Sequence, residues 1–569
     1  MLTSGFLKNK YKEMLFVGLF GWLISVAGDL VDGIIAGIFI NDLAVSAVSL
    51  ISPVLSIMYF ACGFIAKGTA VMYSEASGEF KKDQAYRIGG MGLTLAVICG
   101  AAMMLVVKLL EEPFYTLYGC TGELESYARG YYSMFPLLAI IYPVYWTLYY
   151  LVTADGDTKS IFFANIANVI GNAVFSLIFV RSQGTRGLVI GTVLSFLCGG
   201  IFIIAHFFKK ENSIRLKIGI NFKDLWMMVK IGSSGSLATL YVGLLDMIMN
   251  KYVIAVFGYA FVPAYTVIYF VRNFGSCFSC AAEVAGSFIS VFFGEKNPVS
   301  LKKAFNMALR STVIISCAFL VIMEIAAPML PDMYGITDPD VIAAAVFAGR
   351  VLPLNYIAVG LVFAGIQYYP RIEKIFIGNA LGFLYIFALP VLLLYPLEHL
   401  FGFKGIVFSF FLSPFVTLLA VFIFTGIKYG VKKLPYLLPE TDSRIFAHEF
   451  AVEPEEISTL NSIVAKELEE CGISSKKSTL VQMMIEETFM VVHDKNPGKK
   501  VFADCTVIVE PDKIRLITRD SGIIFDITDS DNKVESLNSY VAGRLMATNS
   551  KVSYFTTIAF NRNSYVWDR

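Results

Sequence analysis

Twelve long apolar runs constrain what this chain can fold into. Each run is about long enough to cross a bilayer core of ~30 Å as a helix that rises about 1.5 Å per residue. The runs lie near residues 14–40, 48–74, 88–109, 130–152, 160–180, 187–208, 224–256, 260–293, 310–330, 340–367, 375–400 and 404–428. With 56% hydrophobic and only 16% charged residues, the chain has more apolar surface than one soluble core can bury. We therefore expect an all-α polytopic protein whose first partner is the lipid bilayer.

The loops between these runs differ in their content of Lys and Arg. Basic residues are frequent in the loops at 79–87, 207–217 and 428–433 and nearly absent from those at 40–44 and 257–261. Because positive charge resists translocation, the basic loops are expected on the inner side of the cell membrane, with both termini in the cytoplasm. The net charge of +1 gives no sign of a nucleic-acid partner.

The membrane part repeats itself at an offset of about 216 residues. Gly78-Glu79 corresponds to Gly294-Glu295, and Pro136 corresponds to Pro353. Since six spans separate the copies, the two halves should have the same orientation, as parallel repeats do. We predict two lobes of six helices, at residues 1–213 and 214–432. Transporters move such halves against each other around a central cavity.

Acidic residues inside apolar runs are the first candidates for function, because charge in a bilayer is costly. Asp29 and Asp32 lie three residues apart and therefore on one helical face. Two such carboxylates cannot readily both ionise without a cation, which favours proton coupling or cation binding. The alternative is that both are exposed near the outer end of the span. Asp246 lies at the position equivalent to Asp29, so each half carries an acid there.

Basic and polar residues inside the spans are further candidates. Lys67 and Glu283 occupy equivalent positions in the two halves, which indicates a central cavity, a direct pair, or a structural salt bridge. Arg272 is another cation within a span. Asn172 and the aromatic run at 142–150 could contact an apolar cation, although lipid contact or packing would equally explain the aromatic run.

Several of these segments together carry a family resemblance. The run GDLVDGIIAGIFINDLAVSAVSLISP (28–53) resembles the first-helix signature of multidrug and toxic compound extrusion (MATE) transporters. SEASGEFKKDQAYR and TADGDTKSIF follow in the order of the family. The resemblance implies a twelve-helix, two-lobed exporter of organic cations or amphiphilic small molecules, in exchange for Na⁺ or H⁺. It also implies that Asp32 is the family's first-helix acid and Asp246 its seventh-helix acid.

One departure from the family concerns the first half. Many members have an acid one turn after the fifth-helix Asn, whereas here Ser176 follows Asn172. Asp29 is our candidate replacement for the missing charge. The expected ion-coupling residues are thus Asp29, Asp32 and Asp246. The expected substrate cavity contains Lys67, Asn172, Ser176, Arg272 and Glu283.

A second domain follows the last apolar run. Residues 433–444 are predicted to be a Pro-containing linker and residues 445–569 a small α/β sandwich. Helical periodicity marks 455–471 and 476–494, and strand-like alternation marks 501–511, 513–520 and 552–560.

This tail resembles the GHKL ATP-binding fold, and in particular the anti-sigma-factor kinases. IEETFMVVHD (485–494) stands at the place of the N-box helix, and DSGIIFD (520–526) at the place of the adenine-reading motif. The resemblance implies nucleotide-binding roles for Glu486, Glu487, Asp520, Gly522 and Gly543.

The motif departs from that family at the metal ligand. Met490 and Val491 stand where an Asn should hold Mg²⁺, and an apolar side chain cannot ligate that ion. Two readings stay open: a degenerate tail that regulates or captures a partner protein, and a tail that still binds ATP and Mg²⁺.

Three functions compete at this stage. The first is a secondary exporter, which is not an enzyme, acting on a small-molecule substrate. The second is a flippase for a lipid-linked substrate, and the third is a membrane-anchored signalling regulator that acts through the tail. No Walker A motif is present in the sequence, so P-loop ATP-driven pumping is not supported.

Overall fold

The computed structural model describes most of the chain. The described residues are 2, 5–117, 121–210, 212–219, 221–258, 261–333, 336–438, 440–526, 551–555, 557 and 560–569. Within them, eleven helical segments are long and apolar enough to cross a membrane. The first helix, α1, is not among these eleven segments and is 34 residues long. The protein is a multi-pass membrane protein, and its helices follow the predicted apolar runs closely.

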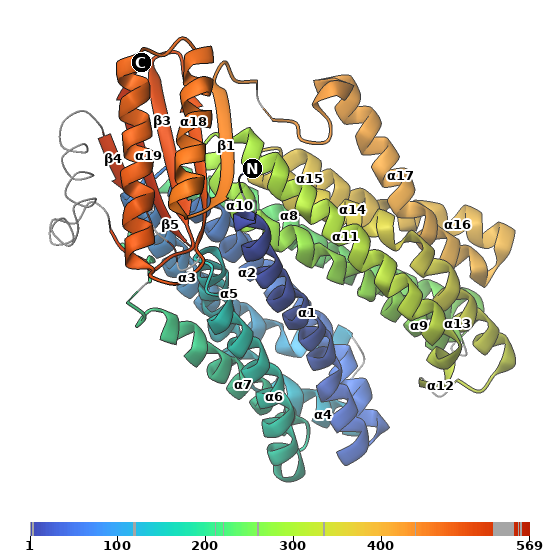
Figure 1. The fold of residues 1–569 in the computed structure, drawn as a ribbon. Coiled ribbons are helices and arrows are strands. Elements are labelled where there is room, and N and C mark those ends of the chain that lie inside the picture. Colours follow the sequence, from blue (N-terminus) through green and yellow to red (C-terminus); the bar gives the residue numbers. More distant parts are fainter. Residues whose placement is uncertain are drawn as a thin grey trace.

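Seven helices form the first half of the membrane part (Figure 1). They are α1 (Phe6–Phe39), α2 (Asp42–Gly78), α3 (Lys82–Leu117), α4 (Gly122–Tyr132), α5 (Phe135–Ala154), α6 (Thr158–Gln183) and α7 (Thr185–His206). The fourth predicted span is divided into α4 and α5 just before Pro136, which cannot donate a backbone hydrogen bond to continue the helix.

The second half contains more breaks. Its helices are α8 (Phe222–Phe257), α9 (Val262–Phe274), α10 (Ser279–Gly294), α11 (Pro298–Ala326), α12 (Leu330–Met333), α13 (Pro339–Val351), α14 (Tyr356–Tyr368), α15 (Ile375–Gly382), α16 (Leu389–Phe401) and α17 (Phe403–Tyr429). Short 3₁₀ or π turns join several of them within one span. One such turn, Leu352–Asn355, contains Pro353, the counterpart of Pro136.

The two halves repeat local geometry as well as sequence. The α6–α7 hairpin turns at Gly184 with φ +57°, and the α16–α17 hairpin turns at Gly402 with φ +59°. Both values lie in the left-handed region that favours glycine. After each turn a second glycine, Gly187 or Gly405, packs directly on the backbone of the preceding helix, where a Cβ would clash. The repeat predicted from sequence therefore describes real structural equivalence at these hairpins.

Contacts between the halves are reciprocal. Helix α1 packs against α10, α8 packs against α2, and α2 packs against α10. Close glycine contacts mark this seam: a Cβ on Gly68 would meet the backbone of Met228, and one on Gly78 would meet that of Val291. The helices approach each other at the end that carries the tail and diverge away from it (Figure 1). The division into two lobes that move separately stays a prediction.

The tail is a two-layer α/β unit. Its antiparallel sheet has the strand order β1-β2-β3-β5-β4, and helices α18 (Pro454–Glu470) and α19 (Ser475–Lys495) cover one face. The other face lies toward the membrane helices (Figure 1). The strands are β1 (Arg444–Ala451), β2 (Phe502–Val509), β3 (Lys513–Asp520), β4 (Lys551–Tyr554) and β5 (Asn561–Asp568).

The strands of this tail differ from the sequence-based expectation. Strand β1 was not among the predicted strands, and its pairing with β2 makes it an edge strand. We predicted a single strand at 552–560. The chain instead forms β4, then a bridge between Thr557 and Phe560, then β5.

The predicted linker is fixed to the second half. Tyr368 and Tyr369 of the α14 region donate hydrogen bonds to the carbonyls of Tyr436 and Pro435, at 2.8 and 3.0 Å. Tyr436 in turn donates to Asn306 of α11, at 2.8 Å. These bonds hold the start of the tail close to the ends of α11 and α14.

Candidate functional site

Asp32 lies in a polar pocket within the first half. Its side chain is 9% exposed. Tyr131 of α4 donates a hydrogen bond to Asp32 Oδ2 at 2.9 Å, and Thr192 of α7 lies 3.2 Å from the same oxygen. Ser176 of α6 lies 3.5 Å from Asp32 Oδ1. Three helices thus place uncharged hydroxyl groups around one buried carboxyl group of α1.

Small residues on α7 make this arrangement possible. Gly187 and Gly191 lie four residues apart on one face of α7, and both pack against α6. A Cβ on Gly191 would clash with Ser176. Such small-xxx-small spacing lets two membrane helices approach closely. As a result, Thr192 and Ser176 reach the same carboxylate.

The hydrogen bonds to Asp32 are fewer than the hydroxyl groups around it. Ser176 and Thr192 each carry one hydroxyl hydrogen, and each oxygen also lies close to the Leu188 carbonyl, at 3.2 and 3.3 Å. Asn172 donates to Thr192 at 3.0 Å, while its own Oδ1 is buried without a hydrogen-bond donor. Among the described residues, no Lys or Arg nitrogen lies within 4.0 Å of Asp32. The pocket is therefore rich in oxygen acceptors and holds no cationic side chain.

The acid of the second half has a different environment. Arg272 of α9 binds Asp246 of α8 through Nη2, at 2.7 Å from Oδ1. Tyr265 donates to the same oxygen at 3.2 Å. The Arg272 guanidinium also lies over the Phe410 ring, 5.0 Å from its centroid. The sequence predicted both charges as site residues but did not predict that they pair.

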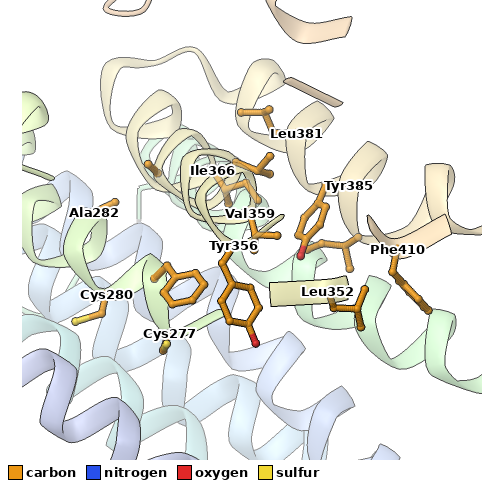
Figure 2. Packing of buried hydrophobic residues seen from close by; sticks show 14 of the residues in the cluster. Cys277, Cys280, Ala282, Leu352, Tyr356, Val359, Ile366, Leu381, Tyr385 and Phe410 are labelled. Carbon is orange, nitrogen blue, oxygen red and sulfur yellow. The ribbon is translucent and has the colours of Figure 1, made fainter. Parts of the chain in front are cut away.

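A small cavity of about 50 Å³ adjoins this ion pair. Figure 2 shows Tyr356, Tyr385, Leu352 and Phe410, which line it from separate segments of the second half. Arg272 completes the lining, and its Nη1 is buried without a hydrogen-bond acceptor. The cavity is thus mostly apolar, with one charged group at its wall.

Lys67 and Glu283 do not form the predicted pair. The Lys67 ammonium lies between two aromatic rings of the first half, 5.9 Å from the centroids of both Tyr59 and Tyr150. No salt bridge within 4.0 Å joins it to Glu283, although both side chains are described and half-buried. Tyr150 belongs to the aromatic run that we proposed as a cation contact, and the cation it meets is the protein's own lysine.

One predicted site residue has a side chain that the structure does not describe, and two residues that contact Asp32 were not predicted. The side chain of Asp29 is not among those described, so its predicted role stays a prediction. Tyr131 and Thr192 were not predicted, because a hydroxyl residue in an apolar run gives no charge signal. Thr192 does stand directly after Gly191, at the end of the motif GTRGLVIGT.

In the tail, the Asp520 carboxyl group accepts hydrogen bonds from other groups of the same domain. It accepts hydrogen bonds from Asn561 Nδ2 at 2.9 Å and from the Gly522 amide at 3.0 Å. Burial raises the pKa of Asp520 to about 6, and these two hydrogen bonds oppose that rise. Gly543 lies outside the described residues.

Helix α19 of the tail carries two neighbouring acids, Glu486 and Glu487. Asn461 donates to Glu486 at 3.4 Å, and Glu487 Oε2 is buried without a donor. Burial raises the pKa of Glu487, and the nearby Glu486 adds to the rise. Met490 and Val491 pack against the tail's hydrophobic core, so neither offers a metal ligand. No group of three His, Cys, Asp or Glu side chains suited to a metal occurs in the described part of the chain.

Comparison with known proteins agrees with this architecture. The MatE family model matches residues 19–178. An outward-facing multidrug resistance MATE family transporter of the MOP superfamily superposes with a TM-score of 0.70 at 19% identity, over 76% of this chain and 100% of that chain. The membrane part of this chain has the MATE fold. A crystal structure of MATE in the straight conformation gives a TM-score of 0.69 at 19% identity, over 75% and 98% of the two chains.

Curated relatives match a similar or smaller share of this chain. The multidrug export protein MepA of Staphylococcus haemolyticus is 20% identical over 437 residues, which cover 74% of this chain and 94% of that protein. The uncharacterized transporter YisQ of Bacillus subtilis is 24% identical over 318 residues, covering 54% and 69%. Each of these matches leaves about a quarter or more of this chain unmatched.

Proposed function

We propose that this protein is a secondary active exporter of organic cations or amphiphilic small molecules, driven by Na⁺ or H⁺ antiport with alternating access. The observation that carries the proposal is the pocket around Asp32. A buried carboxylate with neutral donors and no cationic side chain has a strong electrostatic preference for a bound cation or proton.

The coupling cation is assigned to this pocket on its donor set. Asp32 and the unpartnered Oδ1 of Asn172 are oxygen ligands, with the Ser176 and Thr192 hydroxyls beside them. Hard cations such as Na⁺ prefer oxygen ligands, and a proton on Asp32 would satisfy the same carboxylate. Either species neutralises the buried charge, which is the property that a coupling site requires.

Two further observations support this function. The MepA relatives are multidrug exporters, and they match nearly all of their own length to this chain. In addition, the helices are packed together at the tail end and diverge at the other end (Figure 1). We place the protein in the cell membrane with both termini in the cytoplasm; Figure 1 shows the two ends of the chain on the same side of the helix bundle.

The test is transport in proteoliposomes. The purified chain should move a hydrophobic organic cation such as ethidium when an opposing Na⁺ or pH gradient is imposed. Each gradient is applied separately, which identifies the coupling ion. Absence of movement under both gradients would contradict the exporter proposal.

A flippase for an anionic, lipid-linked substrate is the second candidate, and one observation favours it. Arg272 has an unpartnered Nη1 at an aromatic cavity, and Lys67 lies in a span without a carboxylate partner within 4.0 Å among the described residues. Those cations would suit an anionic headgroup. Competition of ethidium flux by anionic and by cationic amphiphiles separates the two candidates.

For the tail we propose a regulatory role rather than catalysis. Its metal-ligand position is filled by packed apolar residues, and Asp520 already accepts two internal hydrogen bonds. Isothermal titration of the full chain with ATP and Mg²⁺ tests this. Micromolar affinity would contradict a degenerate site.

A further inference from the structure

The sheet face that lies toward the membrane helices carries a buried row of charges. In the strand register Glu449 pairs with Asp504, Asp504 pairs with Arg519, and Arg519 pairs with Arg562. The row therefore crosses four strands on one face of the sheet. Its members are at most 9% exposed, and the two arginines at most 1%. Fully buried arginines are rare unless they are paired, so their partners identify what this face binds.

One end of the row binds mainly the second half of the membrane part, and Glu449 also accepts a hydrogen bond from the Gly5 amide just before α1, at 2.9 Å. Arg519 forms ion pairs with Asp504 of its own sheet and with Glu295, which follows α10. Glu449 accepts from Lys303 of α11 at 2.6 Å. These contacts lie on the same side as the linker, which is also bound to the second half.

The other end of the row binds the first half. Arg562 donates to the backbone carbonyl of Ser77 at the end of α2, and its guanidinium lies 4.6 Å from the centroid of the Phe80 ring. Phe555 packs edge-on against Tyr73 of α2, and Lys82 of α3 lies over the Tyr554 ring at 5.2 Å. The tail therefore spans the boundary between the halves.

The two anchor points are related by the internal repeat. Glu295 is the counterpart of Glu79, which lies two residues beyond Ser77, at the offset of about 216. Between the anchors, Gly78 packs on the backbone of Val291, and Gly294 packs on that of Glu75. Arg562 also approaches Glu295, at 3.4 Å. The arginine pair thus lies directly over the place where the two halves meet.

We propose that the tail is a clamp that holds the tail-side ends of α2 and α10 together through Arg562 and Arg519, and that it must leave one half before the transporter can open on that side. This inference rests on the proposed alternating-access function. A rigid antiparallel sheet fixes the spacing of Arg519 and Arg562, because the two residues are direct neighbours in the β3–β5 ladder. The sheet cannot follow two separating helix ends with both arginines still bound.

The clamp also explains the choice of residues. Arg562 loses water on all sides, and burial lowers its pKa to about 10, although the nearby Glu295 acts in the opposite direction. Such a side chain is costly when docked with few partners and regains its hydration when released. Arg562 meets the first half through a backbone carbonyl and a ring, whereas Arg519 meets the second half through a carboxylate, so the first-half anchor is the weaker of the two. We expect the tail to leave the first half and stay with the second, to which the linker is attached.

The test measures the separation of the two halves directly in the full chain. Spin labels at Lys81 and Lys296, both exposed on the tail side, report the distance between the ends of α2 and α10. Arg562→Ala should add a population at longer distance without any ligand. The matched control is Arg515→Ala, because Arg515 pairs with Glu510 inside the tail. An Arg562→Ala distance distribution identical to that of the wild type would overturn the clamp.

A cross-link provides a second measurement in a chain with its arginines intact. In the variant with Lys82→Cys and Tyr554→Cys, a short bismaleimide joins the two thiols and fixes the tail to the first half. Each single substitution is the control for reaction with native thiols. The long-distance population induced by ethidium should disappear after cross-linking, and ethidium flux should fall at least tenfold. Opening that persists in the cross-linked chain would overturn the proposal. If flux is absent before cross-linking while Arg562→Ala still opens the seam, the exporter function fails and the clamp stands.

Discussion

Each half of the membrane part carries an acid in its first span, and the two acids have opposite electrostatic environments. Asp32 is surrounded by neutral hydroxyl groups, whereas Asp246 is neutralised by Arg272 at 2.7 Å. In a low-dielectric interior an unpaired carboxylate needs a cation or a proton, and a paired one does not. Of these two acids, only Asp246 has a permanent counter-ion among the described residues. If Asp32 is the coupling site that we propose, ion coupling and structural charge pairing are divided between the halves.

The largest effect should come from Asp32→Asn. Asparagine can accept the same hydrogen bonds from Tyr131 but carries no charge to exchange. Gradient-driven ethidium transport should fall to the level of empty liposomes, while the unfolding temperature in detergent stays the same or rises. Retained gradient-driven transport in this variant would show that Asp32 is not the coupling site.

The next effect is on stability and concerns the second half. Asp246→Asn leaves the Arg272 cation buried without its partner, and breaking such a pair costs about 3–5 kcal/mol. The unfolding temperature in detergent should drop clearly. The double variant Asp246→Asn with Arg272→Gln should recover most of the loss. A double variant that is as unstable as the single one would show that the pair is not the source of the effect.

Tyr131→Phe should give a moderate shift in ion dependence. The hydroxyl group donates to Asp32 at 2.9 Å, the shortest of the three hydroxyl contacts to this carboxylate, and hydrogen bonds to charged groups contribute about 1.5–3 kcal/mol. Without that donor the carboxylate should hold its cation more tightly. The cation concentration for half-maximal exchange should fall about tenfold, since 1.4 kcal/mol corresponds to that factor. Tyr265→Phe in the second half is the matched control and should leave it unchanged.

Thr192→Val should give the smallest shift in the same direction. Its hydroxyl hydrogen is divided between Asp32 and the Leu188 carbonyl, so less than one full hydrogen bond to the carboxylate is lost. We expect less than about a threefold fall in the half-maximal cation concentration, well below a net hydrogen bond of ~1 kcal/mol. The control is Thr417→Val on α17, where the hydroxyl donates to Ser413. An effect larger than that of Tyr131→Phe would mean that Thr192, not Tyr131, donates the stronger hydrogen bond to Asp32.

The helices of the membrane part were largely predictable, because apolar length is a strong signal. The break at Pro136 and the hairpin turns at Gly184 and Gly402 follow the repeat that the sequence shows. The tail was harder. β1 is an edge strand with three polar residues among eight, and its place was visible only from its pairing with β2.

The candidate site was predictable only in part. Asp32, Asn172 and Ser176 were predicted and do meet in one pocket, since charge and polarity inside a span are visible in the sequence. Tyr131 and Thr192 were missed, because a hydroxyl residue in a membrane helix is common. Pairing could not be predicted either. The Lys67 ammonium lies over the Tyr59 and Tyr150 rings and forms no salt bridge with Glu283. Which face of a helix meets which neighbour depends on packing, which a single sequence does not encode locally.

The most direct test of the division between the halves is a flux comparison under one imposed gradient. Ethidium movement is followed in proteoliposomes, with Na⁺ and pH gradients applied separately, for three proteins: the wild type, Asp32→Asn, and the double variant of Asp246→Asn with Arg272→Gln. The account predicts gradient-driven movement in the wild type and the double variant and none in Asp32→Asn. Gradient-driven movement in Asp32→Asn, or its loss in a stably folded double variant, would contradict it.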